Sequence, residues 1–477
     1  MSATPLFDVR EFGACGDGRA LDTDAINAAI ARAARSGGTV VVPAGRFLCF
    51  SIRLASGVTL LLSEDAVIEA ADPARHGGAY DLPEEATGEL FQDFGHSHWR
   101  NSLIWGIDLH DVAIVGPGRI EGTGLTRDGP GARWRRDTGE RPLSMTGMSE
   151  AEIRALEPEE QAMIGRGNKA IALKNCCRVT LRDFTIAKGG HFAILATGID
   201  ELLIERLTID TERDGIDLDC VTRTRVRGCR VNSPNDDAIV LKSSYALGAA
   251  IACDDVVIED CTVSGYDAGT LLDGTRGRTQ QLAPDRDRVT GRIKLGTESN
   301  GGFRNIVIRN CRFERSRGLA LETVDGGLIE NVTVSGLTLR EVTTAPLFLR
   351  LGDRGRGPVG TGVGAIRGVT IEGVEASGID HRFAATIAGL PGARIEDVAL
   401  RDIDLTYAGG GTVADGERRP PTLPHAYPEP SMFGITPAWG LWVRHAAGVR
   451  LRDVRLATET HDARHEIVTE DAEIERT

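Results

Sequence analysis

The chain has 477 residues, 41% of them hydrophobic and 26% charged, a balance typical of a globular protein that folds in water. Its formal net charge of −14 argues against a phosphate-backbone partner, so no nucleic acid is expected to bind. Glycine is frequent, at 58 residues, which predicts short elements joined by many tight turns.

Residues 1–12 contain no basic segment followed by an apolar run, so the sequence predicts neither a signal peptide nor a membrane-spanning helix. As written, the protein is therefore expected to be cytoplasmic, with no membrane partner. If an export signal has been removed, it would be periplasmic or secreted. The cysteines number nine, which is odd, and include no Cys-x-x-Cys pair, which argues against a disulfide framework.

The first predicted element is a helix that begins near Asp22-Thr23-Asp24, where polar side chains suit an N-terminal cap. Apolar residues follow at helical spacing, and Gly37 with Gly38 ends the helix. Because terminal elements of repeat proteins cover the open end of the core, we expect residues from 1 to about 45 to form an N-terminal cap.

A short pattern then recurs along the chain, with apolar residues at i, i+2, i+5 and i+7 and small or polar residues between them. The alternation within each half predicts two short strands separated by a kink, because every second side chain of a strand faces the same side. A unit that repeats in this way is one coil of a solenoid. The clearest copies begin at Val179, Leu202, Val256, Ile306 and Val332, with fainter ones at Val398 and Val449.

A second pattern is a ladder of polar residues. Asn168, His191, Asp214 and Asp237 follow one another at intervals of 23 residues, each just before a predicted strand. Because stacked parallel strands lie about 4.8 Å apart, these side chains are expected to form a column at one edge of the solenoid. The strands favour Val, Ile and Thr, which indicates a parallel β-helix rather than a leucine-rich horseshoe of similar period.

We therefore predict an all-β fold, with a single parallel β-helix domain over residues 1–477. Breaks in the pattern predict long loops on the solenoid, and such insertions tend to gather on one face and build a binding site. The predicted loops cover about 72–105, 124–165, 274–291, 351–365 and 407–440.

Three aspartates are candidates for catalysis: Asp214, and one coil later Asp236 and Asp237. Turn chemistry alone accounts for an isolated aspartate at the start of a strand. Three stacked carboxylates instead repel one another, which raises the pKa of one member, as a general acid at neutral pH requires. Hydrolysis of a glycosidic bond needs such an acid and a second carboxylate that activates water or attacks carbon.

Residues 165–302, and more loosely 6–460, resemble the family 28 glycoside hydrolases, the polygalacturonase family. That family carries Asn-Thr-Asp-Gly, then Asp-Asp one coil later, then Gly-His-Gly and Arg-Ile-Lys; Asp214 matches the first motif, and Asp236 with Asp237 the second. The resemblance implies a right-handed β-helix that cleaves an α-glycosidic bond of a pectin-like carbohydrate with inversion. It also implies that Asp236 is the general acid and that Asp214 and Asp237 hold and activate water. We expect no cofactor and no metal.

The later motifs of that family are altered in this chain. In one alignment Arg292 lies near the missing histidine, Glu298 keeps an acidic position, and Ala320 and Glu322 replace the two cations that grip a uronate carboxylate. In the other, Arg292 and Lys294 belong to the Arg-Ile-Lys motif itself and could clamp a carboxylate. We prefer the first alignment, because it also accounts for Glu298. Glu322 facing the subsite without a cation would then exclude uronate and favour a neutral sugar.

Further candidates for substrate binding rest on weaker signals. Asn168 and His191 belong to the ladder, and for His191 a substrate hydrogen bond and a structural role are both open. Trp99 lies in a predicted loop and suits stacking on a sugar, although tryptophans packed under loops are equally common. Lys242 follows a ladder strand and is expected to be solvated or ion-paired if it does not bind substrate. A loop with Glu429 between two prolines could fold over the cleft.

The inserted loops are expected to wall off one end of the cleft, so we predict an exo-acting glycoside hydrolase that is a monomer or a weak oligomer. Two other interpretations stay open. A polysaccharide lyase on the same fold would bind Ca²⁺ through the aspartates and use Lys242 or Arg292 as its base. A non-catalytic carbohydrate-binding β-helix would need none of the aspartates.

Overall fold

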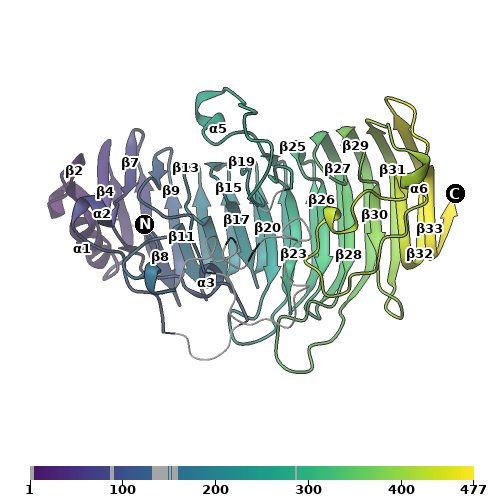
Figure 1. Cartoon of the computed structure of the whole chain (residues 1–477). Coiled ribbons are helices and arrows are strands. Elements are labelled where there is room, and N and C mark those ends of the chain that lie inside the picture. The colour runs from purple at the N-terminus through teal and green to yellow at the C-terminus, as the bar shows by residue number, and fades with distance from the viewer. Residues whose placement is uncertain are drawn as a thin grey trace.

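The computed structural model describes residues 5–85, 91–130, 149, 152, 160–284 and 287–476. Within them the chain winds into one elongated stack of parallel strands, with its first strands at one end and its last at the other (Figure 1). Strands inside the stack pair with a strand from the coil before and one from the coil after, whereas β1, β2, β5 and β33 at its ends pair with one strand each. The predicted parallel β-helix is confirmed.

Three faces run along the stack, and each coil contributes one strand to each face. The first face consists of β5 (Ile52–Arg53), β8 (Ile104–Ile107), β11 (Lys169–Lys174), β14 (Phe192–Thr197), β17 (Asp214–Asp219), β20 (Ile239–Ser243), β23 (Ile293–Ser299), β26 (Leu319–Thr323), β28 (Leu347–Leu351) and β30 (Ala385–Ala388). The second consists of β1 (Leu6–Asp8), β3 (Gly38–Val42), β6 (Val58–Leu62), β9 (His110–Val115), β12 (Cys177–Arg182), β15 (Asp200–Glu205), β18 (Thr222–Arg227), β21 (Cys253–Glu259) and β24 (Phe303–Arg309). The third consists of β2 (Asp17–Leu21), β4 (Gly45–Cys49), β7 (Ala66–Ala70), β10 (Arg119–Glu121), β13 (Thr185–Ala187), β16 (Thr208–Asp210), β19 (Arg230–Asn232), β22 (Thr262–Ser264) and β25 (Arg312–Ser316).

Toward the C-terminus the strands lengthen and run from one face into the next. One of them, β27, pairs with both β24 and β25. These long strands are β27 (Leu328–Val342), β29 (Ala365–Ile379), β31 (Ile395–Tyr407), β32 (Ala438–Thr458) and β33 (His465–Arg476).

The kink predicted within each coil is a corner made by one residue in the left-handed conformation. Asp183, Arg206, Asp260 and Asn310 occupy this corner in four coils, each with φ between 53° and 73°. Asp and Asn tolerate this conformation better than most residues because their short polar side chains hydrogen-bond locally. The corner turns the chain from the second face to the third, so both flanking strands point alternate apolar side chains into one core.

Helix α1 (Thr23–Ala33) lies at the predicted position and buries Ile26, Ala29 and Ile30 against the first coils (Figure 1). Asp22 occupies the N-cap position, but its carboxylate accepts hydrogen bonds from the backbone of Cys15 and Gly16 instead of from the helix. The carboxylate thus ties the preceding turn to the start of the helix.

The other helices in the described ranges are single turns in loops: η1 (Val9–Phe12), α2 (Pro73–His76), α3 (Phe94–Ser97), η4 (Glu160–Met163), α5 (Thr270–Asp273), α6 (Val413–Gly416) and η5 (Pro430–Phe433). Among the described residues no helix is long and apolar enough to cross a membrane. Segments whose described residues form no named strand separate β7 from β8, where 86–90 are not described, and likewise β22 from β23, β28 from β29 and β31 from β32. Much of the predicted loop at 124–165, namely 131–148, 150–151 and 153–159, lies outside the described residues, as do 285–286 of the loop at 274–291.

Candidate active site

An acidic cluster forms where two neighbouring strands of the first face begin. Asp214 is the first residue of β17, and Asp236 and Asp237 lie in the turn that leads into β20. The two strands pair in parallel, with Ile216 beside Ile239, and this register sets Asp214 beside Asp237. Each of the three aspartates has a carboxylate oxygen within 4.8 Å of those of the other two. The structure therefore brings the three predicted residues together.

Asp214 is the most confined carboxyl group of the cluster. It is 3% exposed, and its Oδ1 has no hydrogen-bond partner among the described residues. Burial and the charge of Asp236 raise its pKa well above the ordinary range, although Lys242 opposes the shift. A carboxyl group with a raised pKa can hold a proton at neutral pH and donate it.

Asp236 and Asp237 are each paired with arginine. Arg213 Nη2 lies 2.8 Å from Oδ2 of Asp236, which is the most exposed of the three aspartates. Arg292 Nε donates to Oδ1 of Asp237 at 2.8 Å, and Lys294 Nζ lies 3.5 Å from Oδ2. Burial raises the pKa of Asp237, but the charges of Lys294 and Arg292 outweigh it and lower that pKa to about 2. Asp237 is therefore ionised at neutral pH, as an acceptor of a proton from water must be.

A second group of charges continues from Arg292 and Lys294. Lys294 Nζ lies 3.4 Å from Oε2 of Glu322, and Arg292 donates to both carboxylate oxygens of Glu429, at 2.7 and 3.2 Å. Arg317 Nη1 lies 2.9 Å from the same Glu429 carboxylate. All of these side chains are almost fully buried. The expectation that Glu322 stands without a cation is wrong, because Lys294 reaches it from the preceding coil.

The strand register fixes the order of the coils after Asp237. Lys294 of β23 pairs with Val240 of β20 on one side and with Ala320 of β26 on the other. Arg292 and Lys294 thus belong to the coil directly after the two aspartates, and Ala320 and Glu322 to the next coil.

A third group lies beside the cluster, around Lys242. Its Nζ is 2.8 Å from Oδ2 of Asp217 and 3.7 Å from Oε2 of Glu298, and it also contacts the ring of His96. Arg354 Nη2 lies 3.4 Å from the other oxygen of Glu298. Lys242 is thus ion-paired and nearly buried, and the group forms a charged wall next to Asp214.

Asn168 and His191 do not join the cluster. The register between β14 and β17 sets Phe192, not His191, beside Asp214. The turn before β17 spans residues 211–213, whereas the turn before β14 spans 188–191 and so has one residue more. The predicted ladder therefore breaks at this step. Asn168 accepts from Lys169 Nζ at 2.6 Å, and His191 Nδ1 lies 2.8 Å from the carbonyl oxygen of Arg127, which indicates structural roles for both.

Trp99 offers no ring face to a sugar in this structure. It is 1% exposed, its Nε1 donates to Thr197, and Lys174 Nζ lies 4.0 Å from its ring centre. The ring packs under the loop before β8, which is the structural alternative for this residue. Its loop still reaches the site, because His96 lies 3.2 Å from Asp217.

Sequence reasoning did not single out several residues of the site, including Arg213, Asp217 and Arg317. Their partners lie one or more coils away, so no local pattern marks them. For Glu429 the sequence predicts a loop over the cleft but no ion pair. It reaches the site from the segment between β31 and β32, and the proline on each side of it stiffens that segment.

Comparisons with known proteins agree with this architecture. Residues 159–280 match a family model described as a right-handed β-helix region, and residues 6–72 match one described as rhamnogalacturonase A/epimerase, pectate lyase-like. Fold and matches together define the class: the chain is a right-handed parallel β-helix protein.

A probable polygalacturonase from Vitis vinifera is 25% identical in an alignment of 353 residues that covers 70% of this chain. The match spans 61% of that relative's length. The family 28 exopolygalacturonase of Yersinia enterocolitica has a TM-score of 0.69 at 16% identity, over 99% of this chain and 78% of that one. A hyperthermoactive exopolygalacturonase from Thermotoga maritima has a TM-score of 0.63 at 22% identity, over 85% and 88%. The chain is thus a homologue of a probable polygalacturonase and shares the fold of family 28 exopolygalacturonases.

Proposed function

We propose that this protein is an exo-acting glycoside hydrolase that cleaves an α-linked sugar from a pectin-like oligosaccharide or polysaccharide. The observation that carries the proposal is the acidic cluster, in which three carboxylates approach within 4.8 Å while the pKa values of Asp214 and Asp237 are shifted in opposite directions. Asp237 is held ionised by two cations, whereas the pKa of Asp214 is raised. Pairs of carboxyl groups whose surroundings push their pKa values apart are the signature of acid and base roles.

The proposed reaction uses one proton donor and one proton acceptor. Asp236, the most exposed member, protonates the leaving oxygen as the glycosidic bond breaks. Asp237, aided by Asp214, takes a proton from the water whose oxygen bonds to the anomeric carbon. Asp214, whose pKa is raised by burial and by the charge of Asp236, carries a proton that it can pass to Asp236 for this step. The resemblance to the polygalacturonase family supports these assignments.

Inversion at the anomeric carbon rests on the resemblance rather than on the spacing. Inverting glycosidases commonly hold their two carboxyl groups roughly 6.5–9.5 Å apart, and retaining ones about 5–5.5 Å. Oxygens within 4.8 Å lie nearer the retaining distance. Proton NMR of the first product formed distinguishes the two outcomes, since inversion of an α-linked substrate yields the β-anomer before mutarotation.

Exo-action is supported by the loops around the cluster and by the two exopolygalacturonases that share the fold. Arg356, from the segment between β28 and β29, lies 3.3 Å from Asp93, which precedes α3. Glu429 reaches Arg292 from the segment between β31 and β32. Loops from distant parts of the chain thus meet at the site, as walls of a pocket would.

The charge balance of the second group favours an uncharged sugar next to it. Asp237, Glu322 and Glu429 supply three carboxylates, and Arg292, Lys294 and Arg317 supply three cations, so the group is neutral when all are ionised. At a pH above about 7, where Glu322 is ionised, no cation of this group is left over for a uronate. A uronate carboxylate would have to displace one of the internal ones, at the desolvation cost of the group displaced.

A lyase mechanism is less well supported. The three aspartates could hold a divalent cation, as Ca²⁺-dependent lyases require, but a lyase also needs a basic residue that is deprotonated. Burial lowers the pKa of Lys242, but the charges of Asp217 and Asp214 outweigh it and hold that pKa above its ordinary range. Lys294 is held above its range in the same way by Asp237 and Glu322. Both lysines stay protonated at neutral pH.

The proposal is tested with Asp236→Asn, assayed on pectic oligosaccharides and on a glycosyl fluoride of the sugar released. The variant should lose at least about 99% of its activity on the oligosaccharide, because general acid catalysis contributes roughly 10²–10⁴-fold. It should keep most of its activity on the fluoride, whose leaving group needs no proton. Asp254→Asn, at a strand of the second face, is the matched control. Oligosaccharide activity above about a tenth of wild type would refute the assignment.

A further inference from the structure

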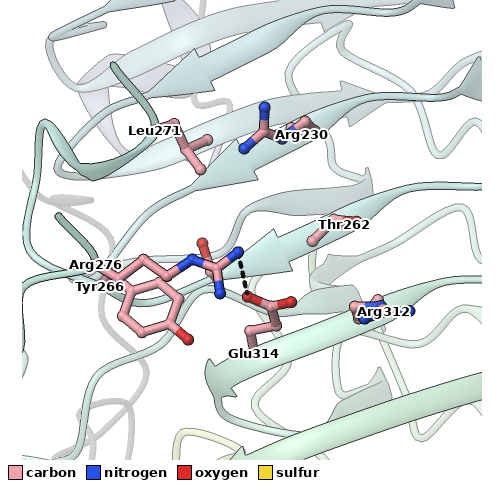
Figure 2. Close-up of a pocket in the computed structure, with 8 residues that line it drawn as sticks. Arg230, Thr262, Tyr266, Leu271, Arg276, Arg312 and Glu314 are labelled. Atoms are coloured by element: carbon pink, nitrogen blue, oxygen red, sulfur yellow. Dashed lines mark ion pairs between the residues drawn. The ribbon is translucent and has the colours of Figure 1, made fainter. Parts of the chain in front are cut away.

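A cavity of about 290 Å³ lies on the third face of the solenoid, away from the acidic cluster. Strands β19, β22 and β25 form its floor, and the loop that carries α5 forms its wall (Figure 2). The side chains that line it alternate with Val231, Val263 and Phe313, which point into the core. The cavity therefore opens on the outer side of the sheet, whereas the acidic cluster lies where first-face strands begin.

Two arginines in this cavity have no acidic partner within the described part of the chain. Arg230 and Arg312 are exposed and flank Thr262 in strand register, so they stand two strand spacings apart, about 9.6 Å. Among the described residues no carboxylate lies within 4.0 Å of either guanidinium. By contrast, Arg309 and Arg340 on neighbouring strands pair with Glu259 and Glu375. Two guanidinium groups thus remain available for an anion.

The rest of the lining adds a third cation, a carboxylate and apolar surface. Arg276 Nη2 lies 3.8 Å from Oε2 of Glu314, and the ring of Tyr266 lies beside them, while Leu271 points toward Arg230 (Figure 2). Three arginines and one glutamate leave a local charge of +2 on a chain whose formal net charge is −14. Such a reversal of sign concentrates an anionic ligand at this one place.

We infer that this cavity is a second carbohydrate-binding site, specific for a short acidic oligosaccharide. Carboxylates of the ligand would pair with Arg230 and Arg312, whose planar guanidinium groups suit bidentate contact. Pyranose rings would lie against Tyr266 and Leu271, since carbohydrate sites combine apolar surface with a few placed polar groups. The volume lies at the lower limit of small-molecule sites, which suits one or two sugar residues rather than a macromolecular surface.

Calorimetric titration with trigalacturonate tests the inference. The titration uses the Asp236→Asn protein, so that the ligand is not consumed, and counts the binding sites. Arg230→Ser combined with Arg312→Ser should remove one site or weaken it about tenfold, because exposed ion pairs contribute roughly 2- to 5-fold each. Arg225→Ser is the matched control, because Arg225 is an exposed arginine on the second face with no carboxylate within 4.0 Å in the described chain, and it should change nothing.

A gain of affinity provides the complementary measurement. Glu314→Gln removes the carboxylate that competes with the ligand for Arg276, so binding of trigalacturonate should strengthen, whereas any binding of a neutral xylo-oligosaccharide should be the same in every variant. The same substitutions in the active enzyme should leave hydrolysis of a short substrate unchanged, so the result does not depend on the proposed hydrolase activity. Unchanged site number and affinity in the double variant, or an equal loss with Arg225→Ser, would overturn the inference.

Discussion

Glu322→Gln should stabilise the protein at high pH. Glu322 is fully buried, neither of its carboxylate oxygens has a hydrogen-bond partner among the described residues, and Lys294 is 3.4 Å away. Burial raises the pKa of Glu322 to about 7, even though Lys294 and Arg292 oppose the shift. The glutamine is nearly the same shape and carries no charge, so the substitution removes only the cost of ionisation.

The magnitude follows from that shift. Against an ordinary value of 4.5, a folded-state pKa of about 7 corresponds to roughly 3 kcal/mol at about 1.4 kcal/mol per unit. Because the pKa of Glu322 is higher in the folded than in the unfolded state, ionisation of this group costs no stability below pH 4.5. The free energy of unfolding then falls as the pH rises through 7. The variant should therefore match wild type near pH 5 and exceed it by up to about 3 kcal/mol at pH 9.

Urea-induced unfolding, followed by tryptophan fluorescence at pH 5, 7 and 9, measures the difference. Glu298→Gln is the control of opposite sign. Burial raises the pKa of Glu298, but Lys242 and Arg354 outweigh it and hold that pKa well below its usual range. Its ionised form is thus stabilising above pH 4.5, and the glutamine should be costly there. Parallel pH profiles for wild type and Glu322→Gln, or a less stable Glu322→Gln at pH 9, would refute the reasoning.

Three further outcomes are expected. Asp214→Asn and Asp237→Asn should each lower kcat by about 100-fold or more, and the double variant should lose little beyond the worse single one, because the carboxylates act as one unit; additive losses would contradict this. Lys294→Met should raise the pKa of Asp237, so the acid limb of the pH profile of kcat/KM should move to higher pH; an unmoved limb would show that Asp237 is not the base. Digestion of a long substrate should release one small product from the start, and an early ladder of intermediate sizes would exclude exo-action. This release should be slower from polygalacturonate than from oligomers with uncharged sugars, and faster release from polygalacturonate would contradict the uncharged subsite.

Much of the architecture could be predicted because every coil of a β-helix repeats the same short sequence pattern. The apolar alternation around Val179 or Ile306 is visible within ten residues, and the corner residues are mostly Asp, Asn or Gly, which favour the left-handed turn. The pairing of Asp214 with Asp237 followed from the same period. The prediction that His191 stacks beside Asp214 was wrong, because the turn before Asp214 is one residue shorter and nothing in the composition marks the missing residue.

The charged surroundings of the aspartates could not be predicted for a different reason. Ion pairs such as Arg292 with Glu429 join residues separated by more than a hundred positions, and they depend on which way loops fold. The sequence shows the charges but not their distances. Glu322 shows the consequence. Its alignment with a cation of the polygalacturonase family suggests that it repels a uronate, whereas Lys294 of the preceding coil pairs with it.

The chain takes 54 residues from Ile239 to Ile293, against 23 from Ile216 to Ile239, yet Ile293 still stacks on Ile239 in parallel register. A long loop within a coil thus leaves the parallel strand pairing unchanged, as long as the chain returns to the same position in the stack. Chemistry and recognition are thereby assigned to separate parts of the molecule that can change independently. The paired strands hold the carboxylates at a spacing that exchange of a loop does not alter. The loops, such as the one that forms the wall of the arginine cavity, can be lengthened, shortened or replaced to change what is bound, while the bond-breaking step stays the same.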